Sequence, residues 1–480
     1  FNTLSMKFAL LFLTPLLLFS KDAPNFIFIL TDDQGWTSLS EPLDPRYPQA
    51  FSDFHKTDSL NTLIKMGMRF TDAYAASPVC APSRYSIQFG KTAARLKRTL
   101  ARGENFADHN QVAIPQILKS IDSRYQCAHF GKWHIDQDPS RYGYDVHDGI
   151  TRNEPGGFHN DEHVLQWGGY LDEDPKKVYS LTDRTIQFMK ECTSKELPFY
   201  VQLSHYALHS DLVYSEESYR EMLLKKPGRR HSNVSYGAML LDLDQSIAKL
   251  LQAFEDLDLI DNTYIIFTSD NGGMPVLPIQ VNRGVPYKKG LNEPLIRGKW
   301  DLMEGGIRVP FSISGPGIEH ESISHHPVVG YDLLPTIVEL ANTQKNEITL
   351  PDHLDGTSIV SELFQNGRNS MPKRPHDGIV FHYPHYNICG LNEPHSAIRS
   401  GVFKLVKFHI SERSLLFDLS KDISESTNLI HELPNTAKEL ENALEAYLEL
   451  VDAEKSEESF TWEKAGQNGS VKTLFFKRYD

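Results

Sequence analysis

Cysteine is scarce in this chain, with four residues in 480. So few thiols exclude a fold held together mainly by disulfides, although one disulfide remains open. The four positions are Cys80, Cys127, Cys192 and Cys389.

Positive charge is also in short supply, because 49 Lys and Arg face 63 Asp and Glu and give a formal net charge of -14. This balance argues against nonspecific nucleic-acid binding and weakly repels anionic substrates, unless a local basic pocket overrides it. From residue 21 onward no apolar run reaches the roughly 20 residues that a membrane-spanning helix needs. We therefore expect no nucleic-acid partner and no stable membrane insertion.

The amino-terminal region has one apolar stretch, residues 8–19, which Lys7 precedes and a short polar segment follows. This order is typical of a secretory signal peptide, with Met6 as the start and cleavage near Ser20. A membrane anchor is the alternative, but about a dozen apolar residues are too few to span a bilayer. We expect residues 1–20 to be a signal region and the protein to be secreted or periplasmic.

Several short apolar runs indicate a sheet, within a composition that is 40% hydrophobic and 11% aromatic. The runs at residues 25–30, 199–203 and 264–268 are uninterrupted and rich in aromatic and β-branched residues, as in strands buried on both faces. Amphipathic stretches at residues 58–66, 114–121, 180–192 and 236–257 predict helices. The pattern predicts an α/β fold with a large, mostly parallel sheet covered by helices.

A polar segment at residues 365–377, with two prolines, reads as a linker or loop. Beyond it lie strand-like runs at residues 378–381, 397–398, 403–408 and 415–419, then a helical stretch at 435–451. This order predicts a small antiparallel sheet with one helix. We expect a catalytic domain at residues 21–370 and a C-terminal α/β subdomain at 371–480.

Polar side chains follow the three apolar runs. Ligands of parallel sheets bind beyond the carboxyl ends of the strands, so these side chains are expected at one edge. The oxygen donors there are Asp32, Asp33, Asp270 and Asn271. Either pair alone is more typical of a turn or a helix cap. Together they suit Ca²⁺, with Mg²⁺ second.

A cysteine in isolation is usually a buried structural residue, but Cys80 is followed by Pro82 and Arg84. A short helix beyond Pro82 would place residue 80 near a helix amino terminus, which favours an anion, and Arg84 would add a fixed positive charge. Lys132 and Lys299 each lie in a glycine and tryptophan context, although most lysines are surface charges. His209 is a candidate general acid, while His205 is equally consistent with a structural role.

These residues carry a resemblance to the type I sulfatases of the alkaline phosphatase superfamily. The family-like segments are residues 24–36, 80–91, 131–134, 270–273 and 297–310, in the expected order, and the similarity extends to the final helix. The resemblance implies an alkaline-phosphatase-like sheet and a sulfuric ester hydrolase. It also implies that a maturation enzyme oxidises Cys80 to formylglycine.

By this resemblance, the four oxygen donors and formylglycine 80 bind Ca²⁺. Arg84 and Lys132 would stabilise formylglycine and sulfate, His134 would assist breakdown of the intermediate, and His209 and Lys299 would contact sulfate and the leaving oxygen. One hydroxyl of the aldehyde hydrate would attack sulfur as the alcohol departs. The second hydroxyl would then lose its proton, so that the aldehyde re-forms and sulfate is expelled.

The chain departs from the family pattern at two places. Gln88-Phe89-Gly90 stands where Leu-Thr-Gly is usual, in the segment that maturation enzymes read, and Leu208 replaces a common proline before His209. Two alternatives remain: a phosphate or phosphonate ester hydrolase, and an inactive sulfatase-like binding protein.

The expected substrate is a sulfated small molecule or oligosaccharide, and secretion favours a carbohydrate sulfate. His382 and His385 lie in an aromatic and imidazole segment near the start of the C-terminal region. They are candidate substrate-binding residues at the rim of the pocket, although a surface turn is equally consistent with this segment.

Overall fold

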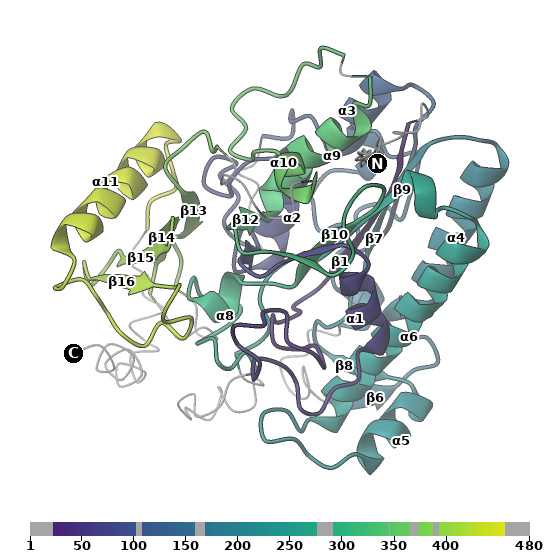
Figure 1. Ribbon diagram of the computed structural model, residues 1–480, viewed down its shortest axis with the longest axis horizontal. Helices are drawn as coiled ribbons and strands as arrows, with labels where there is room; N and C mark the ends of the chain where they lie inside the picture. The colour runs from purple at the N-terminus through teal and green to yellow at the C-terminus, as the bar shows by residue number, and fades with distance from the viewer. Residues whose placement is uncertain are drawn as a thin grey trace, which may run out of the picture.

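An eight-stranded mixed sheet forms the centre of the protein in a computed structural model (Figure 1). The structure describes residues 23–101, 108–158, 169–275, 291–344, 346–364, 373–386 and 393–456. The predicted signal region and Cys389 lie outside the described residues, as do residues 276–290 and part of the predicted linker. In sheet order the strands are β11 (Ser322–Ser324), β2 (Met68–Phe70), β10 (Phe311–Ser314), β9 (Thr263–Ser269), β1 (Asn25–Thr31), β7 (Phe199–Ser204), β4 (Gln126–Gly131) and β5 (Val146–His147).

Strand β1 lies at the middle of this sheet and pairs in parallel with both β9 and β7, and β4 pairs in parallel with β7. Only β10 runs against its neighbours β2 and β9 among the described strands of this sheet. The prediction of a large, mostly parallel sheet is therefore confirmed, with its three predicted strands side by side.

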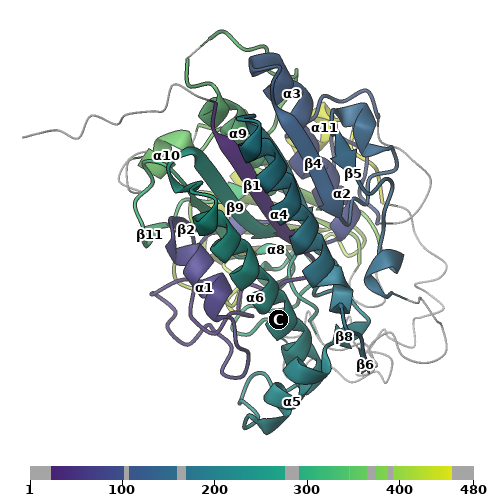
Figure 2. The same cartoon turned by 90° about the vertical axis from the view of Figure 1, so that its right-hand side faces the viewer.

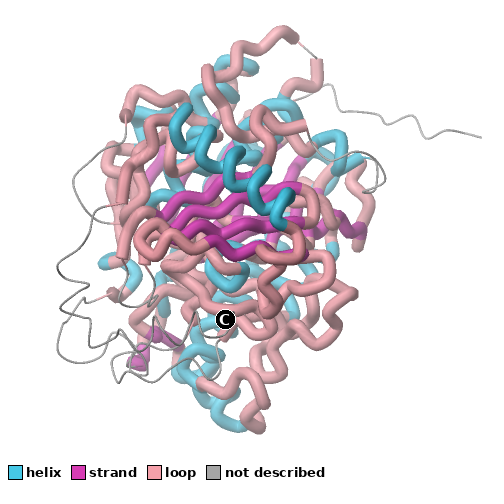
Figure 3. The backbone as a smooth tube through the Cα atoms, turned by 90° about the vertical axis from the view of Figure 1, so that its left-hand side faces the viewer, coloured by secondary structure: helices cyan, strands magenta, loops and turns pink. Residues whose placement is uncertain are grey.

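Helices cover both faces of the sheet, as Figures 2 and 3 show from opposite sides. Because successive side chains of a strand point to opposite faces, Phe26 and Phe28 pack into one core cluster, whereas Ile27 and Ile29 pack into another. The face that carries Ile27 and Ile29 is covered by α1 (Asp58–Lys65), α4 (Val178–Ser194) and α6 (Val234–Asp256). The face that carries Phe26 and Phe28 is covered by α2 (Cys80–Phe89), α3 (Ile114–Ile121), α9 (Leu333–Ala341) and α10 (Val360–Phe364). Of these seven helices, four match the amphipathic stretches predicted from the sequence.

A four-stranded antiparallel sheet follows, in the order β13 (Ile379–Tyr383), β14 (His395–Ser400), β15 (Phe403–Phe408) and β16 (Ser414–Asp418). One face, with Ile398 and Leu405, packs against α11 (Pro434–Leu450). The other face, with Phe381 and Val406, packs against residues of the first region such as Met303. This confirms the predicted small sheet with one helix, whereas the domain boundary near residue 370 stays a prediction.

A buried ion-pair network joins the small sheet to a short helix of the first region. Lys404 Nζ on β15 lies 2.8 Å from a carboxylate oxygen of Glu304 and 2.8 Å from one of Glu425, and all three side chains are fully buried. Glu304 begins α8 (Glu304–Ile307) and also binds Arg308 at 2.6 Å. The carbonyl of Gly306 in α8 accepts a hydrogen bond from Gly272, beside Asn271, so the network supports one of the predicted ligand segments.

We expect Lys404→Met to lower the free energy of unfolding by about 3 to 5 kcal/mol, because it leaves two buried carboxylates without their shared cation. Lys407→Met is the matched control on the same strand. Lys407 pairs with Glu441 at the surface, so its loss is expected to cost under about 1 kcal/mol. Urea unfolding measures both, and equal losses in the two variants would contradict a role for the buried network.

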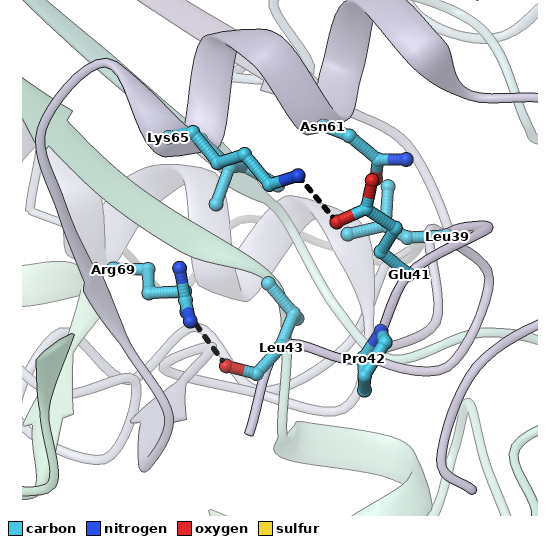
Figure 4. A pocket seen from close by; sticks show the side chains of 8 residues that line it. Leu39, Glu41, Pro42, Leu43, Asn61, Lys65 and Arg69 are labelled. Atoms are coloured by element: carbon cyan, nitrogen blue, oxygen red, sulfur yellow. Dashed lines mark hydrogen bonds and ion pairs between the residues drawn. The ribbon is translucent and has the colours of Figure 1, made fainter. Parts of the chain in front are cut away.

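The remaining described strands form two small pairs, β3 (Ala73–Tyr74) with β12 (Val328–Val329) and β6 (Gly169–Leu171) with β8 (Leu212–Tyr214). Helix α5 (Glu216–Leu224) packs beside α6. No helix in the described ranges combines the length and apolar character that crossing a membrane requires. A surface pocket between α1 and the loop after β1 is bridged by the Lys65 to Glu41 ion pair, and its lining contains none of the predicted site residues (Figure 4).

Candidate active site

The predicted site residues follow the carboxyl ends of four adjacent strands. Asp32 follows β1, Asp270 follows β9, Lys132 follows β4 and His205 follows β7. Backbone hydrogen bonds continue between these segments past the strand ends, from Asp270 to Thr31 at 3.0 Å and from Lys132 to Ser204 at 2.8 Å. Parallel pairing therefore brings residues from distant parts of the sequence to one edge.

The four oxygen donors are fully or almost fully buried and contact one another. The backbone amide of Asp33 donates to Asp270 Oδ1 at 3.2 Å, and Asn271 Nδ2 donates to Asp33 Oδ1 at 2.8 Å. Within the described part of the chain, Asp32 Oδ1 and Asn271 Oδ1 are buried without a hydrogen-bond partner. A buried oxygen without a hydrogen-bond donor needs another partner, and a bound water or cation can supply it.

Three buried cations face these carboxylates. Lys132 Nζ binds Asp32, and Lys299 Nζ lies 2.7 Å from Asp33 Oδ2. Arg84 donates to Asp270 at 2.9 Å and also binds the backbone carbonyl of Lys132. Three carboxylates thus meet three cations, so the protein groups of the site are close to neutral in sum.

Cys80 is the first residue of α2, and its side chain is buried beside the carboxylates. Its sulfur and one oxygen each of Asp32 and Asp33 all lie within 4.8 Å of one another. The helix was expected to begin beyond Pro82 but already begins at residue 80, so Cys80 lies at the positive end of the helix dipole. Arg84 lies one turn further along the same helix.

Burial and crowding of charge perturb the acidic groups. Burial would raise the pKa of Asp32, but the cations Lys132 and Arg84 more than offset it and hold that pKa well below its usual range. Burial, opposed mainly by Lys299, leaves the pKa of Asp33 raised. Burial together with the charge of Asp32 raises the pKa of Asp270 to about 7. A bound divalent cation would favour the charged form of all three groups.

Two histidines complete this edge. His209 Nδ1 lies 2.8 Å from the carbonyl of Ser210, so this nitrogen carries the proton, and the ring packs edge-on against Phe158. Burial, aided by Lys299 and Lys132, holds the pKa of His209 well below its usual range. Burial has the same effect on His134, whose backbone has a left-handed φ of 57°.

Of the other predicted histidines, His205 is fully buried with a pKa lowered to about 3 by burial, and both of its ring nitrogens are buried without a described hydrogen-bond partner. His382 binds Ser396 Oγ at 2.7 Å through Nδ1 and the carbonyl of Glu454 at 2.8 Å through Nε2. His385 contacts Thr99 Oγ1 at 2.7 Å. None of these contacts involves a strand-end residue, and substrate binding by His382 and His385 stays a prediction.

The unusual Gln88 of α2 lies in a buried polar network. Its side-chain amide donates to Gln202 on β7 at 2.5 Å and accepts from the hydroxyl of Tyr144 at 3.1 Å. The next residue, Phe89, packs against Tyr142 in the same core. The folded protein thus accommodates the departure from Leu-Thr-Gly by supplying polar partners from distant segments.

A second group of metal-type donors consists of Asp44, Asp72 and His325. Arg46 lies 2.7 Å from Asp44 and 2.9 Å from Asp72, so a fixed cation already occupies this group.

One buried cation near the strand-end site, Lys176, belongs to no motif, and the sequence gives no signal for it. The three described cysteines, Cys80, Cys127 and Cys192, are free.

A stacked histidine pair supports the segment that leads to Lys299. The rings of His55 and His231 lie 4.6 Å apart, His231 Nε2 lies 2.9 Å from the carbonyl of Leu291, and His55 Nδ1 lies 2.8 Å from that of Ser38. Burial, with a contribution from His231, lowers the pKa of His55 to about 3. The folded protein therefore resists protonation of this pair.

We expect the protein to lose about 2 kcal/mol of stability between pH 7.5 and pH 5 through His55 alone. The unfolded state takes up a proton near pH 6.5, whereas the folded state does so only near pH 3, so the contribution is present above 6.5 and is lost as the pH falls. Thermal unfolding at both pH values measures it. In His55→Asn, whose amide can replace Nδ1 as donor, the loss of stability between pH 7.5 and pH 5 that His55 causes should disappear. The exposed control variant His353→Asn should keep this loss. The same pH dependence in both variants would contradict the assignment.

Comparisons with known proteins agree with this geometry. A family model described as Sulfatase matches residues 24–343, and one described as N-sulphoglucosamine sulphohydrolase, C-terminal, matches residues 298–454. The ulvan-active sulfatase of Formosa agariphila is 26% identical over 463 residues, covering 91% of this chain and 82% of its own length. The human N-acetylgalactosamine-6-sulfatase is 27% identical over 376 residues, covering 71% of this chain and 66% of its own length.

The fold is similar to that of solved structures. The crystal structure of Ps i-CgsB has a TM-score of 0.71 and 24% sequence identity, and the alignment covers 95% of this chain and 99% of that one. At this identity the similarity supports the fold alone. The first family model spans more than half of the chain and includes every strand-end residue described above. This chain therefore belongs to the sulfatase family, whose members are sulfuric ester hydrolases.

Proposed function

We propose that this protein hydrolyses a sulfate ester of a carbohydrate, with residue 80 as formylglycine and Ca²⁺ as the metal. The observation that carries the proposal is the position of Cys80, whose sulfur lies within 4.8 Å of oxygens of two buried aspartates at the start of a helix. A cysteine kept only for packing needs no such polar surroundings. Its sulfur stands in for the oxygen that formylglycine would present there.

The donor set fits a calcium ion. Asp32, Asp33, Asp270 and Asn271 would hold it, because hard oxygen ligands suit Ca²⁺ and two of these side chains have a buried oxygen without a described partner. The bound ion would polarise the sulfate oxygens and favour the ionised form of the nucleophile. Since the protein charges nearly cancel, a dication would leave the site with positive charge, which the single negative charge of a sulfate ester would balance in part.

The surrounding side chains have separate tasks. Arg84 and Lys132 hold the carboxylates in place and present positive charge to sulfate, while Lys299 faces the leaving oxygen. His209 is neutral without substrate, because burial and two lysines depress its pKa. A sulfate group would counter these lysines, so we propose that His209 takes up a proton on substrate binding and returns it to the leaving alcohol. We assign His134 to the breakdown of the sulfated intermediate.

Two relatives support a carbohydrate substrate, since one is named for ulvan and the other for N-acetylgalactosamine 6-sulfate. We further propose that a maturation enzyme modifies Cys80. The predicted signal region supports the proposal that the protein then acts outside the cytoplasm. A two-zinc phosphatase would need more carboxylate and histidine ligands. The second group of such donors among the described residues is already engaged by Arg46.

The test is expression with a formylglycine-generating enzyme, mass spectrometry of the peptide that contains residue 80, and rate measurements on matched esters. We expect conversion of Cys80 and faster hydrolysis of sulfated oligosaccharides than of the same sugars carrying phosphate. An intact thiol, with no hydrolysis, would instead support an inactive binding protein. A strong preference for phosphate monoesters would support the phosphatase alternative.

A further inference from the structure

Lys176 is a buried cation that the chemistry described above does not use. It lies in a single turn of 3₁₀-helix (Pro175–Lys177) between β6 and α4, and only 2% of the residue is exposed. Both Lys176 and its exposed neighbour Lys177 have a left-handed backbone, with φ near 55°. This conformation is uncommon for residues other than glycine, and here it directs two successive lysines differently, one inward and one outward.

The ammonium group of Lys176 lacks a fixed partner. No described residue offers it a hydrogen bond or an ion pair within 4.0 Å, although lysine is almost never fully buried unless it is paired. Asp211, two residues after His209, is the strongest counter-charge that acts on Lys176. Burial lowers the pKa of Lys176 to about 7, as expected for an ammonium without a close counter-ion.

Lys176 lies beside the strand-end site. The charges of Asp32, Asp33 and Lys132 act on it, and its own charge contributes to the lowered pKa of His209. Its 3₁₀ turn packs against β8 and against a second 3₁₀ turn (Glu154–Gly156). Gly156 of that turn packs closely on Tyr206, and Phe158 packs on His209. Lys176 therefore belongs to the wall of the site on the His209 side, where the leaving alcohol departs.

The number of buried charges at the site indicates what Lys176 could bind. The three cations at the centre already match the three carboxylates, so Lys176 is a fourth positive charge beyond the group that handles the scissile sulfate. A buried cation without a partner costs stability unless a bound anion pairs with it. On the leaving-group side, that anion would belong to the alcohol part of the substrate.

We propose, on the basis of the function proposed above, that Lys176 binds a second anionic group of the substrate, a carboxylate or a further sulfate on the sugar that is released. The protein would then act on polyanionic rather than singly charged sulfated carbohydrates. Lys176 would determine specificity and would take no part in bond breaking.

The experiment compares Lys176→Met with the wild type on three matched sulfated disaccharides, one neutral apart from the scissile sulfate, one with a carboxylate and one with a second sulfate. For one of the doubly charged substrates, we expect the KM of the variant to rise by about 10- to 100-fold with little change in kcat. For the neutral substrate the change should stay below about 3-fold. The substrate that responds identifies the group that Lys176 binds.

Lys177→Met is the control, because it removes an exposed lysine from the same turn, and Lys176→Arg should retain part of the preference. Thermal unfolding reports whether each variant is folded. If Lys176→Met does not fold, the KM ratios of Lys176→Gln, which removes the charge but keeps a polar end group, decide, and unchanged ratios there overturn the proposal. Equal effects on all three substrates, or none, also overturn it while the sulfatase function stands. A wild type that cleaves no sulfate ester would overturn the proposed function itself.

Discussion

Replacing Cys80 with alanine is expected to lower kcat by at least about 10⁴-fold, the order of loss seen when a covalent nucleophile is removed from an enzyme. Alanine cannot be oxidised to formylglycine, so the site keeps its cations and its metal ligands but loses the group that accepts sulfate. Steady-state hydrolysis of a sulfated oligosaccharide measures the loss. Calcium binding, followed by thermal shift, should survive in part, because the aspartates and Asn271 remain.

Cys192→Ala is the matched control for this experiment. Cys192 is also a buried free cysteine, but it lies on α4 in the core and away from the carboxylates. We expect activity within about 2-fold of wild type and a stability cost of about 1 kcal/mol. More than a tenth of wild-type activity in Cys80→Ala would mean that residue 80 is not the nucleophile.

Replacing Asp32 with asparagine is expected to lower kcat/KM by about 10²- to 10³-fold and to abolish most of the stabilisation by calcium. Asp32 is bound by Lys132 through one oxygen, while the other is buried without a described partner and is available to a metal. Asparagine keeps the shape of the side chain but removes the negative charge that would hold both Lys132 and the metal ion. The measurement is the unfolding temperature as calcium is added to protein treated with a chelator.

In the wild type, calcium at 100 times its Kd should add about 2.7 kcal/mol to the free energy of unfolding. Asp44→Asn serves as the control, because Asp44 is a buried carboxylate in the donor group that Arg46 already occupies. It should keep the full calcium response. If Asp32→Asn responds to calcium as strongly as the wild type, or if chelation leaves wild-type activity unchanged, the metal assignment is wrong.

Much of the fold could be predicted because its elements have strong local patterns. The strand at residues 25–31 is an unbroken apolar run, and α6 carries apolar residues at helical spacing, so each element is recognisable without its neighbours. The site was predictable for a related reason. Asp32 and Asp270 directly follow such runs, and parallel strands bring their carboxyl ends to one edge.

Other features had no local signal. Gln88 looks unfavourable in a buried helix until Gln202 and Tyr144, far away in the sequence, supply its hydrogen bonds. Lys404 reads as a surface lysine in an alternating strand, but its position against Glu304 and Glu425 buries all three. Both ring nitrogens of His382 hold contacts with groups of the C-terminal region, which its sequence segment did not indicate, and its place at the pocket rim stays a prediction.

The sequence by itself determined the chemistry available to this protein: a cysteine ahead of a proline and an arginine, oxygen donors after buried strands, and lysines in glycine and tryptophan contexts. Only the tertiary structure decided which charges meet. It pairs Lys299 with Asp33 and leaves Lys176 buried without a close partner among the described residues. The physical reason is that the type of residue fixes which groups can carry charge, whereas the strength of their interaction depends on distance and burial, and both arise only when distant segments pack together.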